Sequence, residues 1–203
     1  MTNPRFITFE GPEGSGKTTQ LKLLAARLRA EGHDVVETQE PGGTPIGQQI
    51  RKILLDPAST ALRPTAELLL MFASRAQNVD EVILPALAAG KIVLCDRFTD
   101  STLAYQGAAR GLGADVVYDL DRIACRGLIP HQTFLIDIDT ETGLKRAHQT
   151  RMEEQPLAFH RTVRETFLQL ASDDPKRICV IDGSQSVEEV FQYLWNSIVL
   201  ISK

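Results

Sequence analysis

A glycine-rich loop near the N-terminus constrains the fold of this chain more than any other feature. The segment Gly11-Pro12-Glu13-Gly14-Ser15-Gly16-Lys17-Thr18 follows a short apolar run and precedes a helix-compatible stretch, and it matches the pattern G-x-x-x-x-G-K-[ST]. Chance agreement at the four fixed positions is expected in only about one chain in a hundred of this length. A loop of this kind between a strand and a helix predicts an α/β protein with the P-loop NTPase fold.

The chemistry of phosphate binding explains the composition of this loop. Glycines let several backbone N–H groups converge on phosphate oxygens, and the following helix adds its positive end. Lys17 can reach the β- and γ-phosphates of ATP, and the Thr18 hydroxyl can ligate Mg²⁺. We therefore expect ATP and Mg²⁺ to bind at this loop, with the phosphate-binding residues Gly11, Gly14, Ser15, Gly16, Lys17, Thr18 and Thr19.

Short apolar runs alternate with helical patterns along the whole chain. Most of these runs are apolar on both faces, which is typical of parallel strands covered by helices on each side. The expected strands are 6–9, 34–38, 91–95, 133–137 and 177–181. Leu21, Leu24 and Leu28 mark one helical stripe, and Ser186 is the expected start of the last helix. The pattern predicts three layers, with a five-stranded parallel sheet between helices, in a single domain over residues 1–203.

Composition excludes several classes of protein. The formal net charge of −4 gives no basic footprint for nucleic acid. The apolar runs are too short to span a membrane, and the first residues lack the pattern of a signal peptide. Cys95, Cys125 and Cys179 are widely spaced and show no metal-ligand pattern. We therefore expect a cytoplasmic protein with reduced thiols that binds neither nucleic acid nor membranes.

Four further segments narrow the function. They are Glu40-Pro41-Gly42-Gly43-Thr44 with Arg51 after it, the run Met71-Phe72-Ala73-Ser74-Arg75, Asp96-Arg97-Phe98 followed by residues 100–107, and a basic-acidic stretch from Arg146 to Glu154. In this order they resemble the thymidylate kinase family, of the kind common in bacteria, over nearly the whole chain. The resemblance implies transfer of the γ-phosphoryl group of ATP to thymidine monophosphate, and it also implies a homodimer.

The resemblance implies a binding site for the thymine base. Phe72, or Met71 if the register differs by one, would supply the apolar face, since aromatic stacking is a usual source of base selectivity. Arg75 would donate to a carbonyl of the base, and Thr102 and Gln106 would contact the edge of the ring.

The resemblance also implies contacts to the phosphate and sugar of the acceptor. Arg51 and Arg97 would bind its phosphate, because a guanidinium matches phosphate geometry. Tyr105 would lie against the sugar and exclude a ribose 2′-hydroxyl, and Glu13 would face the 3′-hydroxyl and the metal–water shell. Glu40 and Glu10 could hold this region together through hydrogen bonds. Asp96 could reach Mg²⁺ through water or orient Arg97.

The chain departs from the family pattern in three places. Gly14 stands where some members carry an arginine, and members without it are expected to supply an arginine from a mobile lid. Arg151 best matches that catalytic role, in a lid expected at about 146–158 that is about four residues shorter than usual. Gln39 stands where arginine is common. A kinase of another pyrimidine nucleotide or of a deoxynucleoside remains an alternative, and a non-catalytic ATP-dependent switch is the alternative from another class.

Overall fold

The structure is a computed structural model that describes residues 5–147 and 150–198. At its centre lies a five-stranded sheet with the order β2-β3-β1-β4-β5, in which all neighbouring strands run parallel. The strands are β1 (Arg5–Glu10), β2 (Val35–Gln39), β3 (Ile92–Asp96), β4 (Gln132–Asp137) and β5 (Ile178–Asp182). The predicted parallel sheet is therefore confirmed, and each strand boundary lies within one residue of its expected position.

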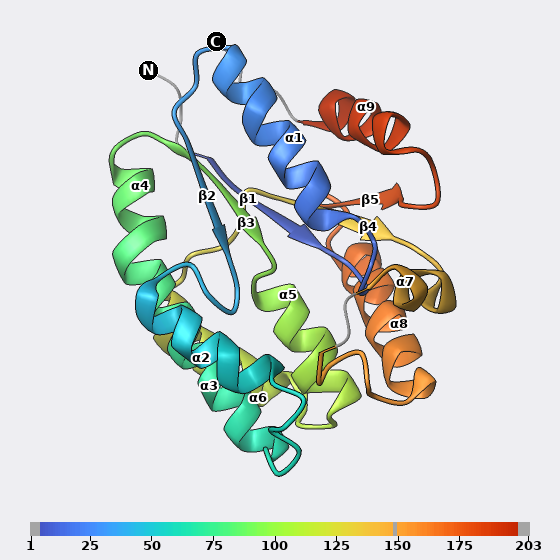
Figure 1. Ribbon diagram of the computed structural model, residues 1–203. Coiled ribbons are helices and arrows are strands. Elements are labelled where there is room, and N and C mark those ends of the chain that lie inside the picture. Colours follow the sequence, from blue (N-terminus) through green and yellow to red (C-terminus); the bar gives the residue numbers. More distant parts are fainter. Residues whose placement is uncertain (1–4, 148–149, 199–203) are drawn as a thin grey trace.

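Helices cover both faces of the sheet (Figure 1). Helices α1 and α9 pack on one face, α3, α6 and α8 pack on the other, and α2 lies against α3. The helical segments are α1 (Lys17–Ala30), α2 (Pro45–Leu55), α3 (Pro64–Asn78), η1 (Val79–Ile83), α4 (Leu84–Ala88), α5 (Thr99–Thr102), η2 (Leu103–Ala109), α6 (Ala114–Cys125), α7 (Thr140–Arg146), α8 (Leu157–Asp173) and α9 (Val187–Ser197), of which η1 and η2 are π-helical. Across residues 5–147 and 150–198, no helix has the length and apolar character needed to cross a membrane.

The central strand β1 has apolar side chains on both faces because it is covered from both sides. Ile7 and Phe9 pack with Leu24 of α1 and Leu194 of α9. Phe6 faces the opposite way, and its ring meets the ring of Phe98 edge-on at a centroid distance of 5.0 Å. The alternation of side chains along a strand thus builds one core on each face, as the sequence predicts.

The last helix, α9, begins where expected. Ser186 and Glu189 form a reciprocal capping box, which satisfies backbone N–H groups at its first turn. The single tryptophan of the chain, Trp195, packs against the core shared with α1. The guanidinium of Arg27 lies 4.8 Å from the centre of its ring.

The carboxyl ends of the strands carry the polar residues that matter for function. The register pairs Gln39 of β2 and Phe9 of β1 with the same residue of β3, Asp96. The loops that follow these three strands therefore meet at one edge of the sheet, which is where open α/β sheets bind ligands.

Candidate active site

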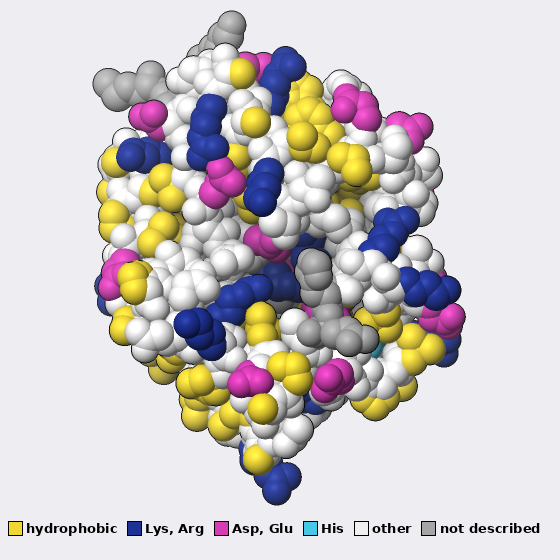
Figure 2. All heavy atoms as spheres, in the orientation of Figure 1, with side chains coloured by type: hydrophobic (Ala, Val, Ile, Leu, Met, Phe, Trp, Pro, Cys, Tyr) yellow, Lys and Arg dark blue, Asp and Glu magenta, His cyan; other side chains and the backbone are white. Residues whose placement is uncertain are grey.

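A cavity of about 470 Å³ opens at this edge of the sheet. In Figure 2 it is the hollow near the centre, where Lys and Arg side chains lie beside Asp and Glu. Most of the expected site residues line it, namely Glu13, Gly14, Gly16, Lys17, Thr18, Thr19, Glu40, Arg51, Arg75, Asp96, Arg97, Thr102, Tyr105 and Gln106. Four predicted residues do not line it, namely Gly11 and Ser15 of the glycine-rich loop, Phe72 and Arg151.

The glycine-rich loop closes around the lysine that ends it. The ammonium group of Lys17 donates to the carbonyl oxygens of Gly11 (3.1 Å) and Pro12 (2.6 Å) and to the hydroxyl of Ser15 (3.2 Å). Burial, together with the charge of Arg97, lowers the pKa of Lys17 to about 8. An incoming phosphate would supply the negative charge that this ammonium group needs.

Two oxygen donors meet beside the loop. The Thr18 hydroxyl donates to a carboxylate oxygen of Asp96 at 2.5 Å. Hydroxyl and carboxylate oxygens are the ligands that Mg²⁺ prefers, together with water and nucleotide phosphates. This pair fits the site expected for the metal.

Glu13, Arg97 and Tyr105 form a connected group at the centre of the cavity. The Arg97 guanidinium donates to Glu13 at 2.9 Å, and the Tyr105 hydroxyl donates to the other carboxylate oxygen at 2.9 Å. Burial alone would raise the pKa of Glu13, but the charges of Arg97 and Lys17 outweigh it and hold that pKa below its usual range. Glu13 is therefore an ionised carboxylate within a field of cations.

Arg75 is held in a buried network at the far end of the cavity. Its guanidinium donates to Glu40 at 2.6 Å and to the Thr102 hydroxyl at 2.9 Å. Asn78 donates to the other carboxylate oxygen of Glu40 at 3.0 Å. Because both partners of the ion pair are only 3% exposed, this arginine has a fixed orientation towards the cavity.

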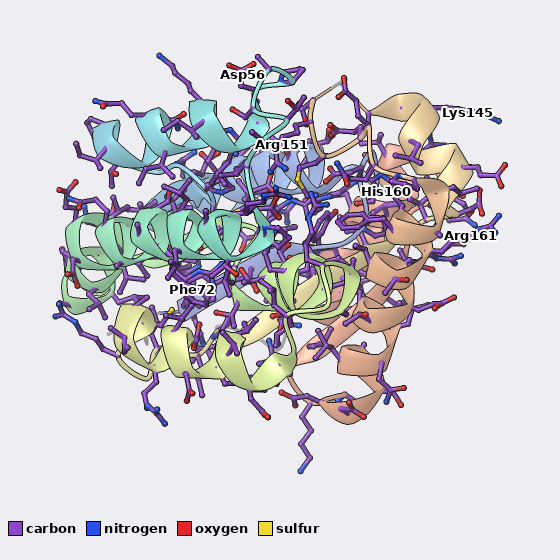
Figure 3. All side chains as sticks on the ribbon, turned by 90° about the horizontal axis from the view of Figure 1, so that it is seen from below. Asp56, Phe72, Lys145, Arg151, His160 and Arg161 are labelled. Atoms are coloured by element: carbon purple, nitrogen blue, oxygen red, sulfur yellow. The ribbon has the colours of Figure 1, made fainter. Side chains whose placement is uncertain are left out.

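The apolar wall at this end is Met71 and not Phe72. Met71 lines the cavity, whereas Phe72 is 4% exposed and packs in the core beneath α3. Figure 3 shows Phe72 between α3 and α6. The Arg75 guanidinium covers the Phe72 ring at 4.8 Å, so Phe72 supports the arginine from behind. Of the two residues that the sequence left open for this wall, the phase of the helix therefore directs Met71, and not Phe72, to the cavity.

Arg51 reaches the cavity from α2. Its guanidinium donates to the carbonyl oxygen of Pro41 at 2.8 Å and makes no ion pair with a carboxylate of the described residues. Burial and the nearby Arg97 lower its pKa. These features favour an anion as its ligand.

Arg151 lies in a buried cluster around Glu67. Its guanidinium donates to that carboxylate at 2.6 Å and to the carbonyl oxygen of Leu54 at 2.9 Å. Arg110 and Gln106 donate to the same carboxylate. Figure 3 shows Arg151 where α2, α3 and the lid segment meet. The structure thus places Arg151, the predicted catalytic arginine of the lid, away from the residues that line the cavity, because the fully buried Glu67 requires cationic partners.

The lid segment contributes residues that the sequence did not single out. Arg146, Thr150, Met152 and Glu153 line the cavity, and the first of these ends α7. Their signal in the sequence was only their place in a basic-acidic stretch. Residues 148–149 of the expected lid, 146–158, lie outside the described residues.

The phosphate loop and α7 touch through their backbones at two glycines. A β-carbon on Gly14 would lie less than 3.0 Å from the carbonyl group of Gly143, and one on Gly143 would lie equally close to the carbonyl oxygen of Glu13. Gly14 also has a φ of 67°, which disfavours other residues. An arginine at position 14 would require α7 to lie farther away.

Comparisons with known proteins agree with this geometry. The family model described as thymidylate kinase matches residues 9–194. A thymidylate kinase of Geotalea uraniireducens is 53% identical over 91% of both chains. That of Deinococcus radiodurans is 48% identical over 98% of both chains. A crystal structure of thymidylate kinase from Ehrlichia chaffeensis superposes with a TM-score of 0.81 at 35% identity, over 98% of this chain and 99% of that one. The phosphate loop, the arginine-lined cavity and these matches together show that this chain belongs to the thymidylate kinase family.

Proposed function

We propose that this protein transfers the γ-phosphoryl group of ATP to thymidine monophosphate, which yields ADP and thymidine diphosphate for the synthesis of thymidine triphosphate. Membership of the family supports the reaction. The observation that carries it is a single cavity in which the phosphate loop with Lys17 lies beside Arg97 and beside Arg51, which has no carboxylate partner in the described part of the chain. Such a cavity can hold two phosphorylated ligands with their phosphates in contact.

ATP would bind along the phosphate loop. The loop amides and Lys17 would hold its β- and γ-phosphates, and Arg146, which lies beside Gly14, would add a cation from the lid. We propose that residues 1–203 act as one kinase domain with a lid at about 146–158. Closure of this lid would exclude water, which prevents hydrolysis of ATP.

The phosphate of the acceptor would lie between Arg51 and Arg97. Its oxygen is already ionised at neutral pH, so it can attack the γ-phosphorus in line without a strong general base, and ADP leaves. Lys17 and the two arginines would stabilise the negative charge of the transferring group.

The thymine base would lie over Met71, in the end of the cavity that contains Arg75. Arg75 would donate to a carbonyl oxygen of the base. Gln106 donates its amide N–H to Glu67 at 2.7 Å, which leaves its amide oxygen to accept the N3–H of thymine. Thr102 would contact the same edge, and the buried polar partners would reject a base with a different hydrogen-bonding pattern.

The deoxyribose would lie between Tyr105 and Glu13. The carboxylate is an acceptor for the 3′-hydroxyl, and the tyrosine ring would leave no room for a 2′-hydroxyl. The hydrogen bond between these two side chains fixes both positions.

Mg²⁺ would be held by Thr18 and, directly or through water, by Asp96, because these oxygen donors meet beside the loop. When bound, the ion would neutralise charge on the β- and γ-phosphates of ATP.

We further propose a homodimer and a cytoplasmic location. Helices α2, α3 and α6 expose the apolar side chains of Ile46, Ile53, Leu69, Val116 and Ile123. Such a patch is typical of a surface that a second copy covers. The free thiols of the three cysteines fit a reducing compartment. Light scattering of the wild type and of Leu69→Glu tests the dimer, which the substitution should dissociate.

The reaction is tested by ADP release with ATP, Mg²⁺ and a panel of nucleoside monophosphates and deoxynucleosides, with Lys17→Ala as the control. Greatest turnover with thymidine monophosphate, lost in the control, is the expected result. Faster turnover with another acceptor would overturn the assignment of the base site and leave the kinase activity intact. ATP binding without transfer to any acceptor would favour a switch.

A further inference from the structure

Arg97 has a backbone conformation that needs support from its surroundings. Its φ of 71° lies in the left-handed region, where non-glycine residues are uncommon because the β-carbon is crowded by the backbone. Two hydrogen bonds hold this backbone: the N–H of Arg97 donates to the Phe9 carbonyl oxygen, and the Cys95 thiol donates to the carbonyl oxygen of Arg97. These bonds fix the backbone, but they do not fix the guanidinium.

The guanidinium of Arg97 is directed by three oxygen acceptors. They are the carbonyl oxygen of Gly11 at 3.1 Å, the carboxylate of Glu13 at 2.9 Å and the hydroxyl of Ser101 at 3.0 Å. Glu13 and Gly11 belong to the phosphate loop. Ser101 belongs to α5, so it fixes the arginine relative to the acceptor side of the cavity.

A buried carboxylate stands behind this serine. Glu10 is fully buried at the end of β1 and does not line the cavity. One of its oxygens accepts the backbone N–H groups of Phe98 at 2.7 Å and Ser101 at 3.3 Å. Its other oxygen contacts the Ser101 hydroxyl at 2.5 Å.

The direction of these hydrogen bonds follows from the chemistry of the groups. A guanidinium has only donors, so the Ser101 oxygen must accept from Arg97. The hydroxyl has one hydrogen, and the ionised carboxylate of Glu10 accepts it. Burial and the neighbouring Asp100 raise the pKa of Glu10 to about 8, so this arrangement is fully formed above that pH. We infer that Glu10 is a positioning residue for phosphoryl transfer, which orients the Ser101 hydroxyl and through it the guanidinium of Arg97. The inference rests on the proposed function, in which Arg97 binds the acceptor phosphate.

Glutamine has nearly the same shape as the ionised glutamate but cannot perform this task. In one orientation of its amide, the NH₂ group faces the Ser101 oxygen, so the hydroxyl hydrogen loses its acceptor. In the other, the NH₂ group faces the N–H groups of Phe98 and Ser101. In either orientation, hydrogen-bond donors face one another without an acceptor between them. The Ser101 hydroxyl, and with it the guanidinium of Arg97, then has no fixed orientation.

The test compares steady-state kinetics of the wild type, Glu10→Gln, Ser101→Ala and the double variant at pH 9, where the wild-type Glu10 is ionised. Each single change is expected to lower kcat/KM for thymidine monophosphate about tenfold, while KM for ATP stays within about twofold, because the loop side of Arg97 is intact. The double variant is expected to lose about tenfold as well, since both changes break one chain of hydrogen bonds. Ser101→Thr, which keeps the hydroxyl, should retain activity.

Thr8→Val is the matched control. It removes a buried hydroxyl of β1 that bonds to Thr133 at 2.7 Å and has no contact with Arg97. Its melting temperature should fall while its kinetics stay unchanged. Additive losses in the double variant, or kinetics of Ser101→Ala equal to those of this control, would overturn the role of Glu10. Arg97→Ala is measured beside them: if it leaves the acceptor kinetics unchanged, the proposed role of Arg97 fails as well. If Glu10→Gln does not fold, the pair Ser101→Ala and Ser101→Thr decides the matter.

Discussion

The contact between Gly143 of α7 and the phosphate loop can be tested by adding one methyl group. A β-carbon on Gly143 would lie less than 3.0 Å from the Glu13 carbonyl oxygen and 3.1 Å from a methyl carbon of Ile138. To restore ordinary van der Waals separation, the loop and α7 must move apart by about 1 Å. This movement displaces Glu13 and Gly14, which both line the cavity.

Stability and activity are expected to respond very differently to Gly143→Ala. Alanine in a helix gains about 1 kcal/mol over glycine, and overpacking costs about 1–3 kcal/mol. The net loss of about 1 kcal/mol would lower the melting temperature by only about 2–4 °C. A shift of about 1 Å at a phosphoryl-transfer site, however, can lower the rate about a hundredfold.

The assay is ADP release at saturating thymidine monophosphate, with thermal unfolding of the same samples. Gly107→Ala is the control, since a β-carbon there would lie 3.5 Å from Val117, an ordinary contact, so activity should be kept. Full activity of Gly143→Ala with an unchanged KM for ATP would refute the idea that this contact holds the loop in place.

Three other results are expected. Arg151→Ala should lower the free energy of unfolding by about 3 kcal/mol, because it removes a partner of the buried Glu67, yet it should leave turnover of the folded enzyme nearly unchanged. Urea unfolding and kinetics at low temperature measure these two quantities. A large loss of kcat at unchanged stability would contradict this expectation. Met71→Ala should raise KM for thymidine monophosphate about tenfold with little effect on stability, whereas Phe72→Ala should destabilise the protein by about 3–5 kcal/mol. A raised KM in Phe72→Ala and an unchanged KM in Met71→Ala would show that Phe72, and not Met71, contacts the base. When ATP binds at pH 8.5, the enzyme should take up a proton at Lys17, because the pKa of about 8 in the free enzyme must rise beside the phosphates. The affinity for ATP should therefore fall as the pH rises above 8. Calorimetry in buffers of different ionisation enthalpy measures the proton uptake, and its absence would contradict the lowered pKa of Lys17.

The fold was predictable because its signals are local. Each strand is a short apolar run, and the cap at Ser186 marks the last helix within its first turn. The glycine-rich loop is equally local, since its function depends on backbone geometry within eight residues. These features require no knowledge of which distant segments meet.

The parts of the site that differed from expectation depend on distant contacts. Whether Met71 or Phe72 faces the cavity follows from how α3 rotates against α6, and one residue changes the direction by about 100°. The position of Arg151 depends on Glu67, which lies 84 residues away in the chain. The close approach of Gly143 to the loop likewise depends on tertiary packing and leaves no pattern in the sequence.

The position of Trp195 has a practical consequence for work in solution. It is the only tryptophan of the chain, it belongs to α9 and packs against Arg27 of α1, and it does not line the cavity. Its emission should therefore report the separation of these two helices on unfolding and stay nearly constant when nucleotides bind. The emission of this one tryptophan can then measure the stability of every variant described above, with or without substrates present.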